Sequence, residues 1–220
     1  MTRVKICGIT NWVDAKVCVD SGASAIGLNF YAASPRSVSP AAAWEIARRL
    51  PPFVEAIGVF VNWQPEAVLS LARALRLQGV QLHGDESAGD VETLAGQISV
   101  IKAVQVKNGF RPESLKKFSA AGAILLDGFR AGLHEGLRGG TGATVDWKLA
   151  ASAGRHANII LAGGLTPENV AEAIFVARPY AVDVASGVES KPGKKDARLV
   201  RAFMSAVTAT DSLAEMNTTL

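Results

Sequence analysis

A cysteine and an aspartate stand where they could act as a base and an acid in proton transfer. Cys7 lies near the end of the first strand-like segment, and Asp127 ends the apolar run Ala-Ile-Leu-Leu-Asp. A carboxyl group that emerges from an apolar strand can have a raised pKa, which suits a general acid. Lys5 would lie on the same strand face as Cys7 and favour its thiolate. The pair therefore predicts an acid and a base that act on opposite faces of one sugar.

Both residues also have an ordinary structural interpretation. A cysteine in a strand usually packs as a small hydrophobic side chain, and an aspartate at a strand end can cap a helix or form an ion pair. Cys18, on the helix predicted after the first strand, is interpreted as such a buried, unreactive thiol. The chemistry of Cys7 and Asp127 depends on whether the fold brings the two side chains to one place.

Two glycine-containing turns, Gly163-Gly164 and Ser186-Gly187, directly follow the last two strand-like segments. Residues without Cβ allow backbone N–H groups to approach phosphate oxygens, and a short helix that begins nearby adds a favourable dipole. Either turn alone could be a tight connection between a strand and a helix. Their occurrence after both of the last two strands favours a phosphate site.

Three further polar residues lie at predicted strand ends or in the loops that follow. Arg36 comes after the second strand, where its planar guanidinium could hold a carboxylate, although it could equally be a solvated surface side chain. His83 ends the fourth strand, and Asp183 lies in the eighth. The three histidines of the chain have no metal-ligand spacing, so we predict no metal site.

These residues must be positioned by elements that alternate along the whole chain, and the alternation predicts a single-domain (β/α)₈ barrel with eight parallel strands. The predicted strands are Val4–Ile9, Ala25–Phe30, Ala56–Val61, Val80–Leu82, Val100–Val104, Ala123–Leu126, Ile159–Ala162 and Ala181–Val184. The predicted helices are 11–22, 40–50, 65–76, 87–96, 112–119, 146–153, 167–176 and 195–208. An open doubly wound sheet is the alternative, but it usually has fewer strands, and no G-x-G-x-x-G turn follows the first strand.

Composition limits the class of protein. The chain of 220 residues is 49% hydrophobic and 20% charged, which predicts one folded domain. We expect a barrel over residues 1–207 and a frayed tail over 208–220, because the helical periodicity is lost there. The apolar runs are too short to cross a membrane and no secretory signal is recognisable, so we expect a cytoplasmic protein. A net charge of +3 with scattered basic residues is too weak for nucleic-acid binding.

Seven motifs occur in order from the first predicted strand to the eighth. They are Lys5-Ile6-Cys7-Gly8-Ile9-Thr10, Ser34-Pro35-Arg36, Gln81-Leu82-His83-Gly84, Leu126-Asp127, Gly139-Gly140-Thr141-Gly142, Ala162-Gly163-Gly164-Leu165 and Asp183-Val184-Ala185-Ser186-Gly187-Val188-Glu189. Together they resemble the phosphoribosylanthranilate isomerases. The opening motif and the closing Ser-Gly-Val-Glu are the most specific.

The resemblance implies an Amadori rearrangement in tryptophan biosynthesis, which converts N-(5-phosphoribosyl)anthranilate to 1-(2-carboxyphenylamino)-1-deoxyribulose 5-phosphate without a cofactor. It implies that Asp127 protonates the ribose ring oxygen to open the sugar into a Schiff base. Cys7, as a thiolate, would then remove the proton from C2. The resulting enolamine would tautomerise to the ketone.

The resemblance also assigns the binding residues. Arg36 would hold the anthranilate carboxylate, and the two glycine turns would hold the phosphate. His83 and Asp183 would contact or orient the substrate between these ends. The Gly139–Gly142 loop has the composition of a lid over the sugar, although a merely mobile loop is equally consistent. The chain departs from the common family pattern at Ala143, where a longer polar residue is usual, and at Val145, where an aromatic residue is common.

Two other functions fit part of this pattern. A histidine-pathway aldose-ketose isomerase performs the same rearrangement on a related substrate, but carboxylates are expected at both of its catalytic positions, where this chain has Cys7. A non-catalytic phosphometabolite-binding barrel would keep the glycine turns without needing Cys7 and Asp127. The sequence leaves monomer and homodimer equally open.

Overall fold

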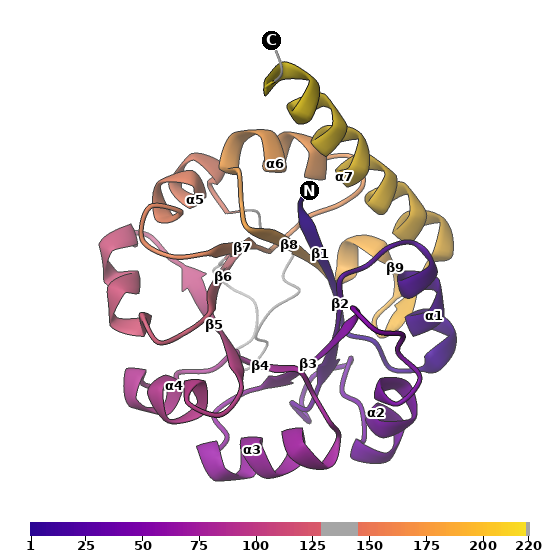
Figure 1. Cartoon of the computed structure of the whole chain (residues 1–220), viewed down its shortest axis with the longest axis vertical. Coiled ribbons are helices and arrows are strands. Elements are labelled where there is room, and N and C mark those ends of the chain that lie inside the picture. The colour runs from indigo at the N-terminus through magenta and orange to yellow at the C-terminus, as the bar shows by residue number, and fades with distance from the viewer. Residues whose placement is uncertain (129–144, 219–220) are drawn as a thin grey trace.

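The computed structural model describes residues 1–128 and 145–218, and its eight parallel strands close into one barrel in chain order (Figure 1). The strands are β1 (Arg3–Cys7), β2 (Ala25–Asn29), β3 (Glu55–Phe60), β4 (Gly79–Leu82), β5 (Ser99–Val106), β6 (Ala123–Gly128), β7 (Ile159–Leu161) and β8 (Ala181–Val184). Because β8 pairs with β1, the predicted barrel is confirmed and the open-sheet alternative is wrong.

Helices surround the barrel and connect its strands (Figure 1). They are α1 (Trp12–Asp20), α2 (Pro40–Ala47), α3 (Pro65–Ala74), α4 (Ala88–Ala95), the 3₁₀ helix η1 (Pro112–Phe118), α5 (Trp147–Ala153), α6 (Val170–Ala177) and α7 (Ala197–Thr218). Pro40, Pro65 and Pro112 each begin a helix, as expected for a residue whose missing N–H is not needed there. None of the described helices is long and apolar enough to cross a membrane.

Two helices begin two or more residues later than predicted, and both differences shape the site. The helix expected from residue 167 begins at Val170, because the side chain of Asn169 accepts a hydrogen bond from the Thr166 N–H and holds a turn before it. The helix expected from residue 195 begins at Ala197. Before it, the 3₁₀ helix η2 (Ser186–Val188) leads into a small antiparallel hairpin, β9 (Glu189–Lys191) and β10 (Lys194–Lys195).

The C-terminal segment expected to be frayed from Thr208 instead continues α7 as far as Thr218. The hydroxyls of Thr208 and Thr210 donate to backbone carbonyls one turn earlier, so these residues fit a helix despite their polarity. The carboxylate of Asp211 accepts hydrogen bonds from the backbone N–H and the hydroxyl of Thr2. This tertiary contact fixes the segment to the start of the chain, so the boundary drawn at residue 207 falls inside a helix.

The alternation of side chains along the strands separates two apolar regions. Ile6 belongs to the large cluster between the strands and the helices, whereas its neighbour Cys7 lines the pocket at the barrel mouth. A smaller cluster fills the barrel itself, with Ala103, Ala123, Leu125, Ile160, Ala162 and Ala181. Leu125 and Asp127 share a strand face, so the barrel filling leads directly to the polar rim.

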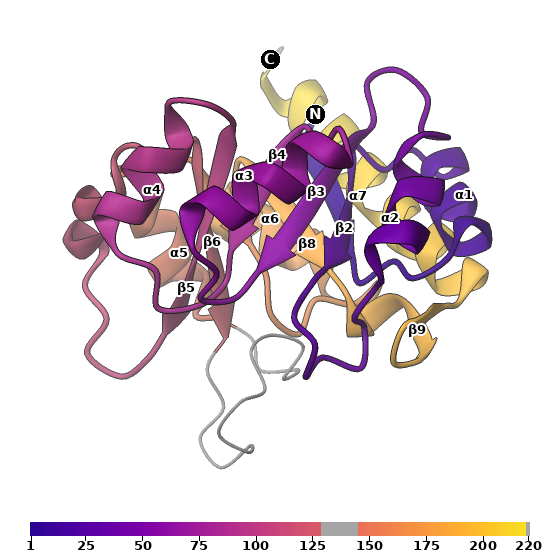
Figure 2. The same ribbon diagram turned by 90° about the horizontal axis from the view of Figure 1, so that it is seen from below.

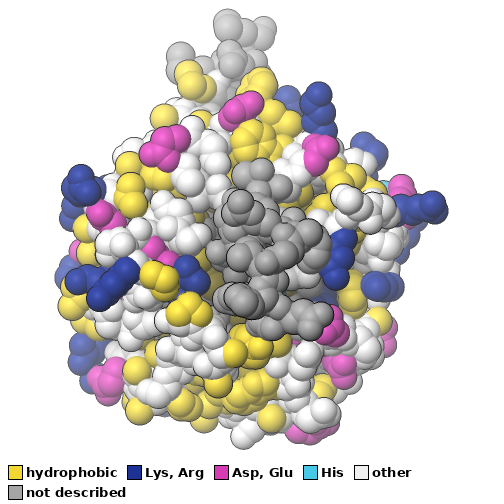
Figure 3. Space-filling view, turned by 180° about the vertical axis from the view of Figure 1, so that it is seen from behind, with side chains coloured by type: hydrophobic (Ala, Val, Ile, Leu, Met, Phe, Trp, Pro, Cys, Tyr) yellow, Lys and Arg dark blue, Asp and Glu magenta, His cyan; other side chains and the backbone are white. Residues whose placement is uncertain are grey.

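The C-terminal ends of the strands lie on the side away from the viewer in Figure 1 and toward the bottom of Figure 2. Figure 3 shows this face, on which acidic and basic side chains are interspersed around the periphery. Among the described residues, no extended patch of one charge is visible in that view.

Candidate active site

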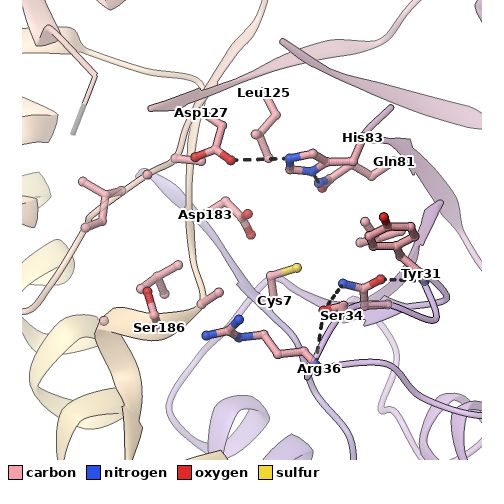
Figure 4. A pocket seen from close by; sticks show the side chains of 18 of the residues that line it. Cys7, Tyr31, Ser34, Arg36, Gln81, His83, Leu125, Asp127, Asp183 and Ser186 are labelled. Carbon is pink, nitrogen blue, oxygen red and sulfur yellow. Dashed lines mark hydrogen bonds and ion pairs between the residues drawn. The ribbon is translucent and has the colours of Figure 1, made fainter. Parts of the chain in front are cut away.

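One pocket at the C-terminal ends of the strands brings together all the site residues predicted from the sequence (Figure 4). They are Cys7, Arg36, His83, Asp127, Gly163, Gly164, Asp183, Ser186 and Gly187. Their positions on six of the eight βα units explain why they are scattered along the chain and adjacent in space. The suggested lid, Gly139–Gly142, lies outside the described residues, whereas Val145 is buried.

A buried ion pair lies next to the pocket, and Asp183, one of its two members, lines the pocket. The register of β1 against β8 places Lys5 opposite Asp183, and Lys5 Nζ lies 2.9 Å from Asp183 Oδ1. Burial alone would lower the pKa of Lys5, but the charge of Asp183, together with the nearby Cys7, outweighs burial and raises that pKa. Lys5 is therefore held as a cation inside the barrel. Asp183, predicted to contact or orient the substrate, is engaged by this cation at one of its oxygens.

Cys7 lies beside this pair, and its thiol is harder to ionise than an ordinary cysteine. Burial raises the pKa of Cys7, and the opposing effect of Lys5 is too small to reverse the shift. Lys5 thus favours the thiolate, as the sequence led us to expect, but the resting residue is a thiol. Cys18 is fully buried between helix and barrel, and burial raises its pKa to about 12, which fits the prediction of an unreactive thiol.

Asp127 and His83 face each other across the pocket, with His83 Nε2 3.4 Å from Asp127 Oδ2 (Figure 4). Gln81 Nε2 lies 2.8 Å from His83 Nδ1. If the amide donates this hydrogen bond, the imidazole hydrogen stands on Nε2, which lies near the Asp127 carboxyl group but makes no hydrogen bond among the described residues. The sequence analysis did not identify Gln81 as a site residue. The signal was present, because side chains two positions apart along a strand point to the same face, and Gln81 stands two positions before His83.

Arg36 lines the pocket, but one edge of its guanidinium is already bound. Its Nε and Nη2 donate to the carboxylate of Glu189, with Nη2 2.7 Å from Oε2. This edge is occupied by Glu189, so a substrate carboxylate could meet only the other edge of the guanidinium, which Nη1 and the second N–H of Nη2 form. Among the described residues, Nη1 has no partner of its own in the structure, so it stays available to the pocket.

The two glycine turns approach each other so closely that side chains would not fit. Gly163 and Gly164 have φ angles of +83° and +60°, which are costly for other residues. A Cβ on Gly187 would overlap the carbonyl oxygen of Leu165. Asn169 Nδ2 donates to the Gly164 carbonyl at 2.9 Å and holds the first turn in place, while η2 begins at the second. This arrangement suits an anion such as phosphate.

The closed barrel, the facing acid and thiol, and the paired glycine turns at the C-terminal rim define the class of an α/β-barrel enzyme for a small phosphorylated substrate. The model of the family described as N-(5'-phosphoribosyl)anthranilate (PRA) isomerase matches residues 4–206. The chain belongs to this family.

Individual relatives are similar over nearly their whole length. An N-(5'-phosphoribosyl)anthranilate isomerase of Geobacter sulfurreducens is 47% identical over 93% of this chain and 97% of its own. A crystal structure of a phosphoribosylanthranilate isomerase in complex with reduced 1-(o-carboxyphenylamino)-1-deoxyribulose 5-phosphate is 44% identical, with a TM-score of 0.84 over 95% of this chain and 100% of its own. A structure of monomers generated from the dimeric Thermotoga maritima enzyme is 43% identical, with a TM-score of 0.83 over the same shares.

The raised pKa of Cys7 predicts its reactivity. Alkylation of Cys7 by iodoacetamide should be slow at neutral pH and should rise to a midpoint above the ordinary thiol value of about 8.5, because only the thiolate reacts. Lys5→Met should move the midpoint further upward, since the cation that favours the thiolate is lost. Peptide mapping after timed labelling separates Cys7 from Cys18, and Lys16→Met on the surface is the control. A midpoint below the ordinary value would contradict the assignment.

The close approach of the turns predicts the effect of one added methyl group. Gly187→Ala should displace the turns and raise KM about tenfold, the size of a lost charge-assisted hydrogen bond, with a smaller effect on kcat. Gly96→Ala is the matched control, because a Cβ there meets nothing within 4 Å. Steady-state kinetics of both variants test this, and an unchanged KM in Gly187→Ala would remove the turns from the substrate site.

Proposed function

We infer that this chain catalyses the Amadori rearrangement of N-(5'-phosphoribosyl)anthranilate in tryptophan biosynthesis. The observation that carries the proposal is one pocket that Cys7 and Asp127 line together with Arg36 and the two glycine turns. The substrate is an anion at both ends. Holding its phosphate on the turns and its carboxylate at Arg36 would fix the ribose between the acid and the base, which removes much of the entropic cost of the reaction.

The first step assigned to Asp127 is protonation of the ribose ring oxygen. The C1–O bond breaks as the anthranilate nitrogen donates its electron pair, and the product is the open Schiff base. Asp127 is left as a carboxylate, which His83 would stabilise by a hydrogen bond from Nε2. Gln81 supports this step from behind, because its bond to Nδ1 fixes the orientation of the ring.

The second step assigned to Cys7 is removal of the proton from C2. The Cys7 thiol first loses its proton to water, and the thiolate then takes the proton from C2 of the protonated Schiff base. The C2–H electron pair forms the C1=C2 bond and the C=N π pair moves to the nitrogen, which gives the enolamine that tautomerises to the ketone. Lys5 would stabilise the thiolate while it exists, and Asp183 would keep Lys5 in place. A thiol whose pKa is raised is a stronger base once ionised, which suits abstraction from carbon. All of these groups belong to the chain itself.

The roles of Cys7 and Asp127 predict a loss of chemistry with binding retained. Cys7→Ala and Asp127→Asn should each lower kcat by about 10²-fold to 10⁴-fold, because each removes one proton-transfer group. Calorimetry with the reduced product analogue should show affinity within a few-fold of the wild type. Cys18→Ala and Asp20→Asn make the same chemical changes outside the pocket and should retain turnover.

Turnover measurements with two substrates separate the competing functions. The wild type is given both the anthranilate substrate and the corresponding aminosugar phosphate of histidine biosynthesis, and it is introduced into a tryptophan auxotroph that lacks this step. Turnover of the histidine intermediate alone would favour the histidine-pathway isomerase. Binding without turnover of either substrate would favour the non-catalytic barrel. Near-normal kcat in Cys7→Ala or Asp127→Asn would refute the role of that residue.

We also propose that the chain forms a homodimer in the cytoplasm. The T. maritima relative is described as dimeric, and here the loop between α2 and β3 lies at the end of the barrel opposite the pocket (Figure 2). Phe53 belongs to this loop and is 98% exposed. Phe53 and Tyr180 line one surface cavity there, which suits contact with a second copy. The unpaired Cys7 and Cys18 accord with a reducing compartment.

The dimer proposal predicts a mass near twice 23.0 kDa by light scattering after size exclusion. Phe53→Ser should shift the protein to the monomer and retain turnover, because the active site lies at the other end of the barrel. Phe175 is also an exposed aromatic residue, but it lies on α6, so Phe175→Ser should leave the dimer intact. A wild type that is monomeric at every concentration tested would exclude the proposal.

A further inference from the structure

Glu189 is a buried carboxylate that the steps above do not use. It begins β9, and its side chain is only 3% exposed. Its carboxylate accepts hydrogen bonds from Nε and Nη2 of Arg36. It also accepts one from Lys195 Nζ at 2.9 Å and one from the Gly193 N–H. A carboxylate this deeply buried needs such partners, because removing an unpaired charge from water costs several kcal/mol.

Lys195, on β10, connects this carboxylate to the rest of the pocket. Its Nζ donates to the carbonyl oxygens of Cys7 at 2.6 Å and of Ala185 at 3.0 Å, and its side chain is 1% exposed. One ammonium group therefore touches the backbone of the residue assigned as base, the residue before the Ser186 turn, and Glu189. Its charge also acts on Cys7 in the direction that lowers the thiol pKa.

The geometry at Arg36 restricts how its guanidinium can meet a ligand. Hydrogen bonds from two nitrogens, Nε and Nη2, to one carboxylate fix both the position and the plane of the group. The bound edge is Nε and Nη2, so the remaining donors belong to Nη1 and the second N–H of Nη2. Arg36, Lys195 and Glu189 together carry one net positive charge, which matches a single substrate carboxylate.

We propose that Glu189 and Lys195 are positioning residues that set the preference of the site for a carboxylated aromatic amine. Glu189 holds Arg36 by one edge so that Nη1 meets the anthranilate carboxylate, and Lys195 holds Glu189 in place. Neither residue touches the substrate. The inference rests on the proposed function, since it takes anthranilate as the group at this end of the pocket.

A purely structural ion pair would have a different signature from a positioning pair. Loss of a structural contact weakens every ligand of the pocket, because the loops move. Loss of correct positioning weakens only ligands that carry the carboxylate. Two product analogues can separate these cases: reduced 1-(2-carboxyphenylamino)-1-deoxyribulose 5-phosphate and the same compound with a plain phenyl ring.

The experiment is calorimetry of both analogues with the wild type, Glu189→Gln, Arg36→Ala and the double variant. Glu189→Gln should weaken the carboxylated analogue about tenfold or more, the size of a charge-assisted hydrogen bond, and change the phenyl analogue less than about twofold. In Arg36→Ala, adding Glu189→Gln should cause no further loss of carboxylate preference, because the positioned group is gone. Glu45→Gln is the matched control, since Glu45 pairs with Arg48 and Arg49 on the surface of α2.

Different failures have different meanings. Equal weakening of both analogues by Glu189→Gln, or no weakening of either, would overturn the positioning role. The anthranilate site of the proposed function would instead be refuted by two results together. These are a wild type that does not prefer the carboxylated analogue and an Arg36→Ala variant that binds this analogue normally. If Glu189→Gln does not fold, Glu189→Asp keeps the charge but shortens its reach, and a selective loss of the carboxylated analogue is again expected. Equal weakening of both analogues in a folded Glu189→Asp variant would count against the proposal.

Discussion

The pairing of β8 with β1 closes the barrel and places Lys5 opposite Asp183, so that a cation and an anion meet inside a barrel whose filling is largely apolar. Much of the site depends on this pair. An unpaired charge at either position would be strongly destabilising, because burial removes its hydration. The pair also sets the surroundings of Cys7, whose thiol must ionise beside one positive and one negative group. Closure of the sheet is thus a condition for folding and, through the same two residues, for the proposed chemistry.

The polar side chains of the pocket fall into three groups, each joined by its own contacts. Lys5 and Asp183 accompany the thiol, Gln81 and His83 face Asp127, and Glu189 with Lys195 holds Arg36. Lys195 reaches two of these groups, because it also binds the carbonyl of Cys7. Such preorganisation suits a reaction that moves protons between fixed positions, since little reorganisation is then left for the moment of reaction. The glycine turns add a separate anion site without a charged side chain.

Much of this site was open to prediction from sequence, for local reasons. The alternation of apolar runs with amphipathic stretches gave the barrel, and prolines at helix starts fixed several boundaries. The two-residue period of a strand determined that Cys7 faces inward when Ile6 faces outward. The hairpin of β9 and β10 was missed because it is short, and the helical continuation beyond Thr208 was missed because it depends on the contact of Asp211 with Thr2. Polar residues at these places look like loop or tail until their distant partners are known.

The sequence by itself determined which residues stand at the ends of strands, and hence that Cys7, Asp127 and the glycine turns share one rim, because strand order and alternation are properties of the local chain. Only the tertiary structure decided the electrical state and the orientation of those residues. Lys5 meets Asp183 across 178 residues and Arg36 meets Glu189 across 153. Contacts at such separations follow from strand register and loop path, and so do the raised pKa of Cys7 and the bound edge of Arg36. Burial and charge pairing act through space, and no spacing along the chain encodes them.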